Sequence, residues 1–297
     1  MNALNNYLGS RAELVQDKHA FSNFNAGWRR FVAARLGRAY TRGPRPRQCG
    51  DLGASLTVLT YLALHYWAGA GHEFNQLRGL LPVGSSLLAP DLPGFGAQAA
   101  PAGFDYSVGA YADWVADYLA AQHLEEYVLI GHSMGGKIAL ALAARQPAEL
   151  RGLVLLSPSP PSPEPISDQD RAASLAAYGQ HLEAEKTATK IVIRPVAKEV
   201  RQQVIADNLR TSQAAWDAWL EHGSKEDISA LMPAIQVPCH LLVGDADHAI
   251  TLAAQQQQTL PLLPAGSPLV VVPEAGHLLP LEAPDTILEV LLKLASA

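Results

Sequence analysis

A strand, a sharp turn and a helix are expected in direct succession in residues 127–144, and this stretch constrains the fold more than any other. Tyr127–Ile130 is a short apolar run of β-forming residues, and Gly136–Ala144 is a small, apolar run with helical character. Between them lies Gly-His-Ser-Met-Gly, residues 131–135. A serine on so tight a turn needs glycine two residues before and after it, because the strand and helix backbones approach too closely for a Cβ atom.

This turn makes Ser133 the candidate catalytic nucleophile. It directs the hydroxyl outward over the sheet, and the N-terminus of the following helix favours developing negative charge. A bare Gly-x-Ser-x-Gly is a weak signal, since small-residue turns match it by chance, and the alternative is a plain tight turn. The strand before it and the helix after it favour the catalytic interpretation.

The rest of the chain repeats an order of strand, loop and helix. The strands read as nearly continuous apolar runs, which is typical of a parallel sheet that helices cover on both faces. We therefore predict the α/β class, with a mainly parallel central sheet flanked by helices. Besides the central stretch, the expected strands are 55–65, 84–90, 150–157, 237–244 and 268–273, and the expected core helices are 72–81, 106–122 and 284–294, with a further helix around 255–258.

The repeat is interrupted after Ser157. Residues 158–165 are rich in proline and cannot form a central strand. From there to residue 232 the chain reads as helices, and the best of the few strand signals is at 191–193. We predict a helical cap over residues 158–232, inserted in a core made of 51–157 and 233–297. The clearest helices of this cap are expected at 168–182, 195–209 and 213–222.

A serine nucleophile needs a histidine base, and that histidine needs a carboxylate to fix its tautomer. In the nucleophile-elbow arrangement the carboxylate and then the histidine follow in loops after later strands. His277 lies after the last expected strand and is the candidate base. Asp245 and Asp247 both follow the strand at 237–244, and we favour Asp247 as the acid. Glu274 and Glu282 are more distant candidates.

Two backbone N–H groups are needed to stabilise the oxyanion. Met134, directly after the nucleophile, is expected to provide one of them. The other is expected from the loop after the strand that ends near His65, with Trp67 as the candidate. The side chain of Trp67 is also a candidate lining residue. In the cap, Tyr178, Trp216, Trp219 and Leu220 either line the pocket or pack the cap itself.

The first 50 residues differ in charge from the remainder. They hold nine of the 22 basic residues and two of the 28 acidic residues, which leaves 13 basic and 26 acidic residues in 51–297. This arginine-rich N-terminal extension is either a solvated extension, a targeting or anionic-surface arm, or a segment foreign to the enzyme. The acidic remainder argues against nucleic acid or an anionic membrane as the main partner.

Cysteine content and hydropathy bear on the compartment. Cys49 and Cys239 are the two cysteines, and two lone thiols suit a reducing compartment. We find no signal-peptide pattern and no apolar run of transmembrane length. These observations favour a cytoplasmic protein without stable membrane association, and they leave its oligomeric state open.

Four motifs in this order give the chain a family resemblance. They are residues 65–71, 91–96 and 131–136, and the pair formed by 244–247 and 276–277. The chain resembles enzymes of the α/β-hydrolase fold superfamily, of the esterase, lipase, haloperoxidase-like and C–C hydrolase kind. The resemblance implies an eight-stranded, mainly parallel sheet, a helical cap between strands six and seven, and no cofactor or metal.

The chain departs from this family in two places. Tyr66 follows His65 where the family usually has glycine, and its bulk is expected to narrow the acyl side of the pocket. The family also opens with an antiparallel pair of strands, and residues 1–50 show no convincing hairpin. The sheet is therefore expected to be short of edge strands, at some cost in stability.

From the triad and the resemblance we expect a serine hydrolase that cleaves small-molecule carboxylic esters with short to medium acyl chains. The same triad also serves lactonases, perhydrolases, C–C bond hydrolases and acyl transferases. A haloalkane dehalogenase is disfavoured, because it needs a carboxylate where Ser133 stands. A non-catalytic binding protein and an enzyme body that folds poorly without its first strands are the remaining alternatives.

Overall fold

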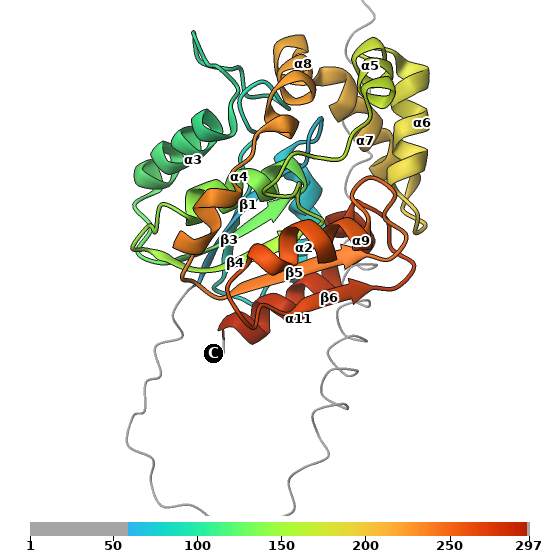
Figure 1. Cartoon of the computed structure of the whole chain (residues 1–297). Helices are drawn as coiled ribbons and strands as arrows, with labels where there is room; N and C mark the ends of the chain where they lie inside the picture. The colour runs from blue at the N-terminus through green and yellow to red at the C-terminus, as the bar shows by residue number, and fades with distance from the viewer. Residues whose placement is uncertain (1–58, 296–297) are drawn as a thin grey trace, which may run out of the picture. The chain divides into compact units, whose positions relative to one another are not determined.

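A computed structural model of the chain describes residues 59–295, and within this part six strands form one parallel sheet (Figure 1). The strand order is β2-β1-β3-β4-β5-β6, and every neighbouring pair is parallel. This confirms the predicted α/β class. The strands are β1 (Thr60–Leu64), β2 (Ser86–Leu88), β3 (Tyr127–His132), β4 (Leu150–Leu156), β5 (Cys239–Gly244) and β6 (Leu269–Val272).

Helices connect the strands and complete the described part. The α-helices are α2 (Asn75–Leu80), α3 (Val108–Gln122), α4 (Met134–Ala143), α5 (Asp168–Ala176), α6 (His181–Ile191), α7 (Lys198–Arg210), α8 (Gln213–Glu221), α9 (Leu252–Ala254), α10 (Leu279–Glu282) and α11 (Pro284–Ala295). The short 3-10 or π-type turns are η1 (Gly71–Phe74), η2 (Gly223–Lys225), η3 (Ser229–Ala234), η4 (Gln255–Thr259) and η5 (Leu260–Leu262).

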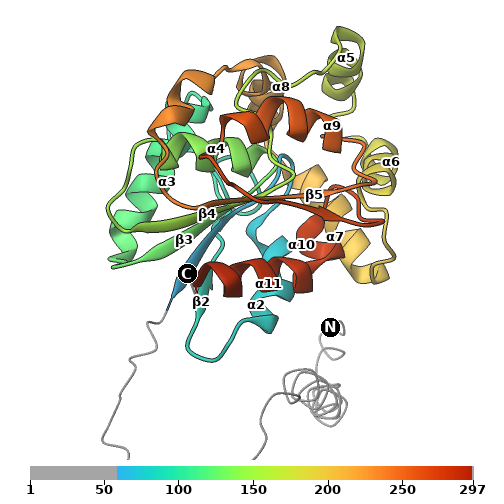
Figure 2. The same ribbon diagram turned by 60° about the horizontal axis from the view of Figure 1, so that its bottom comes forward.

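Both faces of the sheet are buried, which explains why the strands lack a polar side. In β1, Tyr61 and Ala63 belong to the apolar core on one face, while Leu62 and Leu64 belong to the core on the other. Successive strand residues point to opposite faces, so a strand covered on both sides must be apolar throughout. Figure 2 shows α2, α10 and α11 on one face of the sheet and α3 and α4 on the other.

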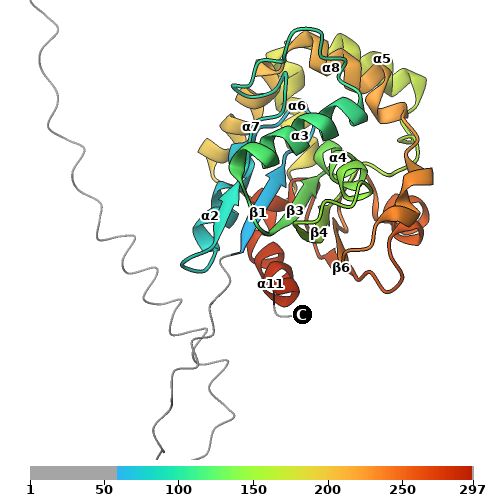
Figure 3. The ribbon, with the colours of Figure 1, turned by 90° about the vertical axis from the view of Figure 1, so that its left-hand side faces the viewer.

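The helices α5 to α8 follow β4 and precede β5 in the chain, so they form a helical insertion in the sheet-forming sequence. Figures 1 and 3 show these four helices gathered at one end of the sheet, away from α11. The proline-rich residues 158–165 lead into the insertion and contain no strand or helix, as predicted.

Two local predictions in the insertion are wrong. The strand signal at 191–193 is not realised, because Ile191 is the last residue of α6 and the next residue, Val192, is buried in a small apolar cluster. Tertiary packing therefore outweighs β propensity at this position. The single helix expected at 168–182 is two helices, and the chain turns between them at Gly179, whose φ is +68°.

The described part contains six strands where the family resemblance implies eight. The predictions for residues 1–50, including those for the expected extension and Cys49, fall outside the described residues. Along residues 59–295, no helix is both long enough and apolar enough to cross a lipid bilayer.

Candidate active site

Ser133 lies between β3 and α4, as the sequence predicts. The strand ends at His132 and the helix begins at Met134, so one residue makes the whole turn. Its backbone angles are φ 52° and ψ −117°, which a non-glycine residue adopts only at a cost of about 1–3 kcal/mol. Such strain is held by the surrounding structure and is common at functional sites.

The glycines on either side are required by close backbone approach. A Cβ atom at Gly131 would lie 2.6 Å from the Cα of Gly136. At Gly135 it would lie 2.3 Å from the carbonyl oxygen of Leu64, in the neighbouring strand β1. Both distances are far below van der Waals contact, so the Gly-x-Ser-x-Gly pattern follows from the packing of α4 against the sheet.

Hydrogen bonds to neighbouring segments fix the backbone of Ser133. Its N–H donates to the carbonyl of Leu156 at 3.0 Å. Its own carbonyl accepts from the N–H groups of Gly136 at 2.8 Å and Ser159 at 2.9 Å. Ser133 is therefore held at the carboxyl end of β3, where the loops that follow parallel strands form a crevice.

His277 and Asp247 are brought together from two different loops. The Nδ1 atom of His277, in the loop after β6, lies 2.8 Å from Oδ2 of Asp247, in the loop after β5. The other carboxylate oxygen of Asp247 accepts from the N–H groups of Ala249 at 2.8 Å and Ile250 at 3.0 Å. Asp247 is 3% exposed and His277 is 4% exposed. The carboxylate thus receives donors at both oxygens and holds the imidazole ring in one orientation.

Asp245 contacts a different group. Its Oδ1 accepts a hydrogen bond from the N–H of Glu274 at 2.6 Å, which joins the loops after β5 and β6. The two loops approach closely at Gly244, where a Cβ atom would lie 2.2 Å from the carbonyl oxygen of Ala275. Of the two candidate aspartates, Asp247 is the one that the fold brings to His277.

The pKa of His277 is raised and the pKa of Asp247 is lowered. Burial works against the charged form of both groups, but the charge and hydrogen bond of Asp247 raise the pKa of His277 above its usual value. Burial likewise opposes ionisation of Asp247, and its interaction with His277 nevertheless lowers the pKa of that carboxyl. Each group therefore favours the charged form of the other.

The two predicted oxyanion donors have free N–H groups. Within residues 59–295, the backbone N–H groups of Trp67 and Met134 donate no hydrogen bond to another protein group. Met134 begins α4, so its N–H is one of the unpaired donors at the helix N-terminus. Both N–H groups are thus available to an external acceptor.

The loop that carries Trp67 is held by a buried histidine. Nε2 of His65 accepts from the N–H of Leu92 at 2.9 Å, so the ring proton is on Nδ1, which lies 2.7 Å from the carbonyl of Tyr66. Burial lowers the pKa of His65, which is consistent with this neutral tautomer. The bulky Tyr66 lies against the backbone at Gly69, where a Cβ atom would meet its ring at 2.3 Å.

A pocket of about 360 Å³ lies between the sheet loops and the helical insertion. Ser133, His277 and Trp67 all line it. Its insertion side includes Trp216, Trp219 and Leu220, three of the four cap residues considered from the sequence. The fourth, Tyr178, is not a lining residue; it packs its ring against Trp216, with 5.7 Å between ring centroids.

The charged side chains of the pocket are mostly acidic. Glu164, Asp170 and Glu183 line it together with one basic residue, Lys190. Burial raises the pKa of Glu164, whose charge also acts on His277. Glu183 is paired with Lys186 at 2.6 Å, whereas the described residues include no ion-pair partner for Glu164. Glu164 is thus an acidic side chain of this pocket whose charge helps to raise the pKa of His277.

One residue near the site has a role that the sequence did not indicate. Glu282, a remote candidate for the acid, instead uses Oε2 to accept from the N–H groups of Gly276 at 2.9 Å, Ile193 at 3.1 Å and Arg194 at 2.8 Å. It thereby ties the insertion to the loop that carries His277. No sequence pattern links these positions, since only the fold brings them together.

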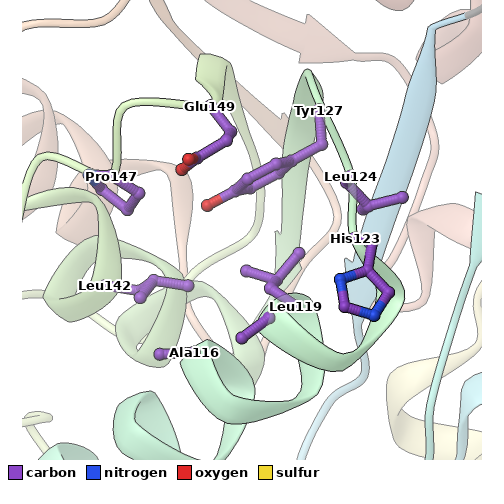
Figure 4. Close-up of a pocket in the computed structure, with 9 residues that line it drawn as sticks. Ala116, Leu119, His123, Leu124, Tyr127, Leu142, Pro147 and Glu149 are labelled. Carbon is purple, nitrogen blue, oxygen red and sulfur yellow. The ribbon is translucent and has the colours of Figure 1, made fainter.

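No group of three or more His, Cys, Asp or Glu side chains in residues 59–295 is arranged to hold a metal ion. A second cavity, of about 390 Å³, lies near the N-terminal end of β3 and includes Tyr127, Leu142 and Glu149 (Figure 4). None of the predicted site residues lines this cavity, whereas Ser133 and His277 both line the first pocket.

The sequence also matches known proteins. Residues 61–290 match the model of the alpha/beta hydrolase family. The chain belongs to that family. A pimeloyl-[acyl-carrier protein] methyl ester esterase of Neisseria meningitidis serogroup B (strain H44/76) is 30% identical over 229 residues, which are 72% of this chain and 84% of that protein.

Two further similar proteins have other activities. A 2-succinyl-6-hydroxy-2,4-cyclohexadiene-1-carboxylate synthase of Enterobacter sp. (strain 638) is 28% identical, covering 72% of this chain and 83% of that protein. The crystal structure of a bromoperoxidase from Bacillus anthracis aligns with a TM-score of 0.75 at 16% identity, covering 81% of this chain and 93% of that one. This structural likeness shows the alpha/beta hydrolase fold, and the family resemblance drawn from the sequence is confirmed.

Proposed function

We propose that this alpha/beta hydrolase is a serine hydrolase that cleaves carboxylic esters with short to medium acyl chains. The observation that carries the proposal is the 2.8 Å contact between Nδ1 of His277 and Asp247, in the pocket that also holds Ser133. Along the chain the nucleophile, the acid and the base follow one another in the order of the nucleophile-elbow enzymes. The esterase among the relatives is consistent with this activity.

In the proposed mechanism, Ser133 Oγ attacks the ester carbonyl and its proton passes to Nε2 of His277. This nitrogen makes no hydrogen bond within the described residues, while Nδ1 is held by Asp247. The N–H groups of Trp67 and Met134 stabilise the oxyanion. His277 then protonates the leaving alkoxide, and a water molecule, deprotonated by His277, releases the acid and regenerates Ser133.

The proposed substrate is a small-molecule ester without a free carboxylate. A pocket of about 360 Å³ is of the size that holds small ligands. Three acidic side chains and one lysine line it, so a carboxylate on the substrate would be repelled. This charge balance favours a neutral ester over a carboxylate-bearing substrate.

We also propose the division of the chain in which residues 158–232 form a cap over a core of residues 51–157 and 233–297. The pocket is lined by both segments, with Trp216 from the first and Ser133 from the second, which supports a cap that closes the site from one side.

The test is turnover of p-nitrophenyl esters, from acetate to palmitate, by the wild-type chain and by Ser133→Ala. We expect hydrolysis of the shorter esters that is lost in the variant. A folded wild-type protein that hydrolyses none of these esters would contradict the proposal, as would activity that survives in Ser133→Ala.

A further inference from the structure

His132, the residue before Ser133, is buried between two groups of the site. Its Nδ1 atom lies 2.9 Å and 3.1 Å from the carboxylate oxygens of Glu73, in η1. Its Nε2 atom lies 2.9 Å from the backbone carbonyl oxygen of His277. The side chain of His132 is fully buried and Glu73 is 4% exposed. The ring therefore bridges a buried carboxylate and the backbone of the proposed base.

The partners of this ring determine where its protons lie. A carbonyl oxygen only accepts hydrogen bonds, so Nε2 of His132 must carry a proton. Nδ1 faces both oxygens of Glu73, and an ionised carboxylate also only accepts. An imidazole that donates from both nitrogens is positively charged, and Glu73 provides the opposite charge. A buried charge pair of this kind is tolerated because each partner is hydrogen-bonded to the other.

His132 acts on His277 at its main chain. The N–H of His277 donates to the carbonyl of Ile191, at the end of α6, at 3.0 Å. Its carbonyl accepts from His132, and its ring is held by Asp247. With both backbone groups fixed, the direction of the Cα–Cβ bond of His277 is set, and the rotamers open to its side chain are limited.

We propose that His132 is a positioning residue for His277: Glu73 holds its ring, and its Nε2–H fixes the carbonyl of His277, so that the imidazole of His277 stays directed at Ser133. The inference rests on the proposed function, because it assigns His277 the role of base. It extends the site by a histidine–carboxylate pair that does not itself touch the substrate.

Among the described residues, the titratable groups around this pair include His65, on which the charge of Glu73 acts, and His277, whose ring centroid lies 5.1 Å from that of His132. Tyr66 packs its ring against His132, with 5.4 Å between the ring centroids. Burial has the largest effect on the pKa of His277 and lowers it. The carboxylates of Asp247, Glu164 and Glu73 act in the opposite direction and raise this pKa. Removal of the charge of Glu73 therefore lowers the pKa of His277 in addition to loosening its backbone.

Glu73→Gln tests the proposal, because glutamine keeps the shape of the side chain and removes its charge. Asp207→Asn is the matched control. Asp207 is also 4% exposed and also pairs with a histidine, His72, at 2.5 Å, but it makes no contact with His277. Both variants would be compared with wild type in kcat, KM and the pH profile of p-nitrophenyl butyrate hydrolysis.

We expect Glu73→Gln to lower kcat by roughly tenfold or more, with a smaller change in KM, because a misdirected base impairs the chemical step more than binding. The acid limb of the kcat/KM profile should move to lower pH by roughly half a unit. In Asp207→Asn, kcat and the position of the acid limb should both stay at the wild-type values. The proposal would be overturned if folded Glu73→Gln had the kcat and the pH profile of wild type. It would also be overturned if Glu73→Gln and Asp207→Asn lost equal amounts of kcat.

Two further measurements keep the outcome decisive. If Glu73→Gln does not fold, the double variant Glu73→Gln with His132→Leu removes both charges together. We expect this double variant to show the same loss of kcat. A wild-type kcat in it would refute the positioning role of His132. NMR of ¹⁵N-labelled histidines in wild type should show protons on both ring nitrogens of His132, and a single proton would overturn the assigned pair. This measurement needs no turnover, whereas absent Ser133-dependent turnover in wild type would refute the proposed function instead.

Discussion

Nζ of Lys137 donates a hydrogen bond to the backbone carbonyl of Ser162 at 3.2 Å, which joins the helix behind Ser133 to the segment that enters the helical insertion. The same ammonium group donates to the carbonyl of Glu226 at 2.5 Å, where the chain leaves the insertion. Lys137 is fully buried. One lysine thus connects α4, the helix that follows Ser133, to both ends of the insertion.

This burial leads to a prediction about stability and pH. Burial lowers the pKa of Lys137 to about 8 from 10.5. Between these two values the unfolded chain binds more protons at this site than the folded chain, so the free energy of unfolding rises with pH. Between these two pH values, we expect the free energy of unfolding of wild type to rise by up to about 3 kcal/mol relative to that of Lys137→Met. Below about pH 8 both states are protonated, and the difference should be constant.

Urea unfolding of both proteins at several pH values measures this difference. Lys186→Met, at an exposed lysine paired with Glu183, controls for the loss of one positive charge. A difference between wild type and Lys137→Met that stays flat or falls from about pH 8 to about pH 10 would contradict the assigned burial effect.

The two aspartates after β5 give a matched pair of variants. In Asp247→Asn the side chain no longer presents a charged acceptor to Nδ1 of His277, so the ring loses its fixed tautomer and its stabilised cation. We expect kcat to fall by roughly a thousandfold or more. In Asp245→Asn the amide oxygen still accepts from the N–H of Glu274, and activity should stay within a few-fold of wild type.

Steady-state kinetics on the best p-nitrophenyl ester, with circular dichroism to verify folding, compares these two variants. A large loss in Asp245→Asn with near-normal turnover in Asp247→Asn would assign the acid to the other residue.

Charge selectivity is the third prediction, and it concerns Glu164. Replacing this pocket carboxylate by glutamine removes a negative charge near His277 and Ser133. We expect kcat/KM for an ester with a terminal carboxylate, relative to its methyl ester, to rise by roughly threefold to tenfold in Glu164→Gln. The measurement is the ratio of kcat/KM values for the two substrates, which cancels general damage to the enzyme.

Glu183→Gln is the control, because Glu183 also lines this pocket but is already paired with Lys186 at 2.6 Å. Its ratio should remain near that of wild type. An unchanged ratio in Glu164→Gln would show that this carboxylate does not select substrates by charge.

Local patterns were sufficient for much of the sheet and for the elbow. The apolar runs at β1, β3 and β4 are short and have no polar side, and burial on both faces of a sheet leaves no other composition. Gly131 is demanded by its approach to Gly136 in the same turn, although Gly135 also meets Leu64 of β1. Features that depend mainly on neighbouring residues can be predicted from a short stretch of sequence.

Predictions failed or stayed open where contacts with a distant segment determine the local conformation or the partner of a side chain. Val192 has β propensity, but it lies in an apolar cluster directly after α6, and it forms no strand. Asp245 and Asp247 both follow β5, and the sequence only favours Asp247; the contact with His277 depends on how the loop after β6 folds back on the loop after β5. Propensity carries no information about such encounters.

The sequence by itself determined the α/β class and the turn that carries Ser133, and it predicted the order of the proposed serine, acid and histidine. Only the tertiary structure decided that Asp247 meets His277 and that Glu73 and His132 lie behind it. The physical reason is range. Backbone strain and two-sided burial act over neighbouring residues, whereas a hydrogen bond between Glu73 and His132 exists only after β1 and β3 have paired and brought their carboxyl ends together.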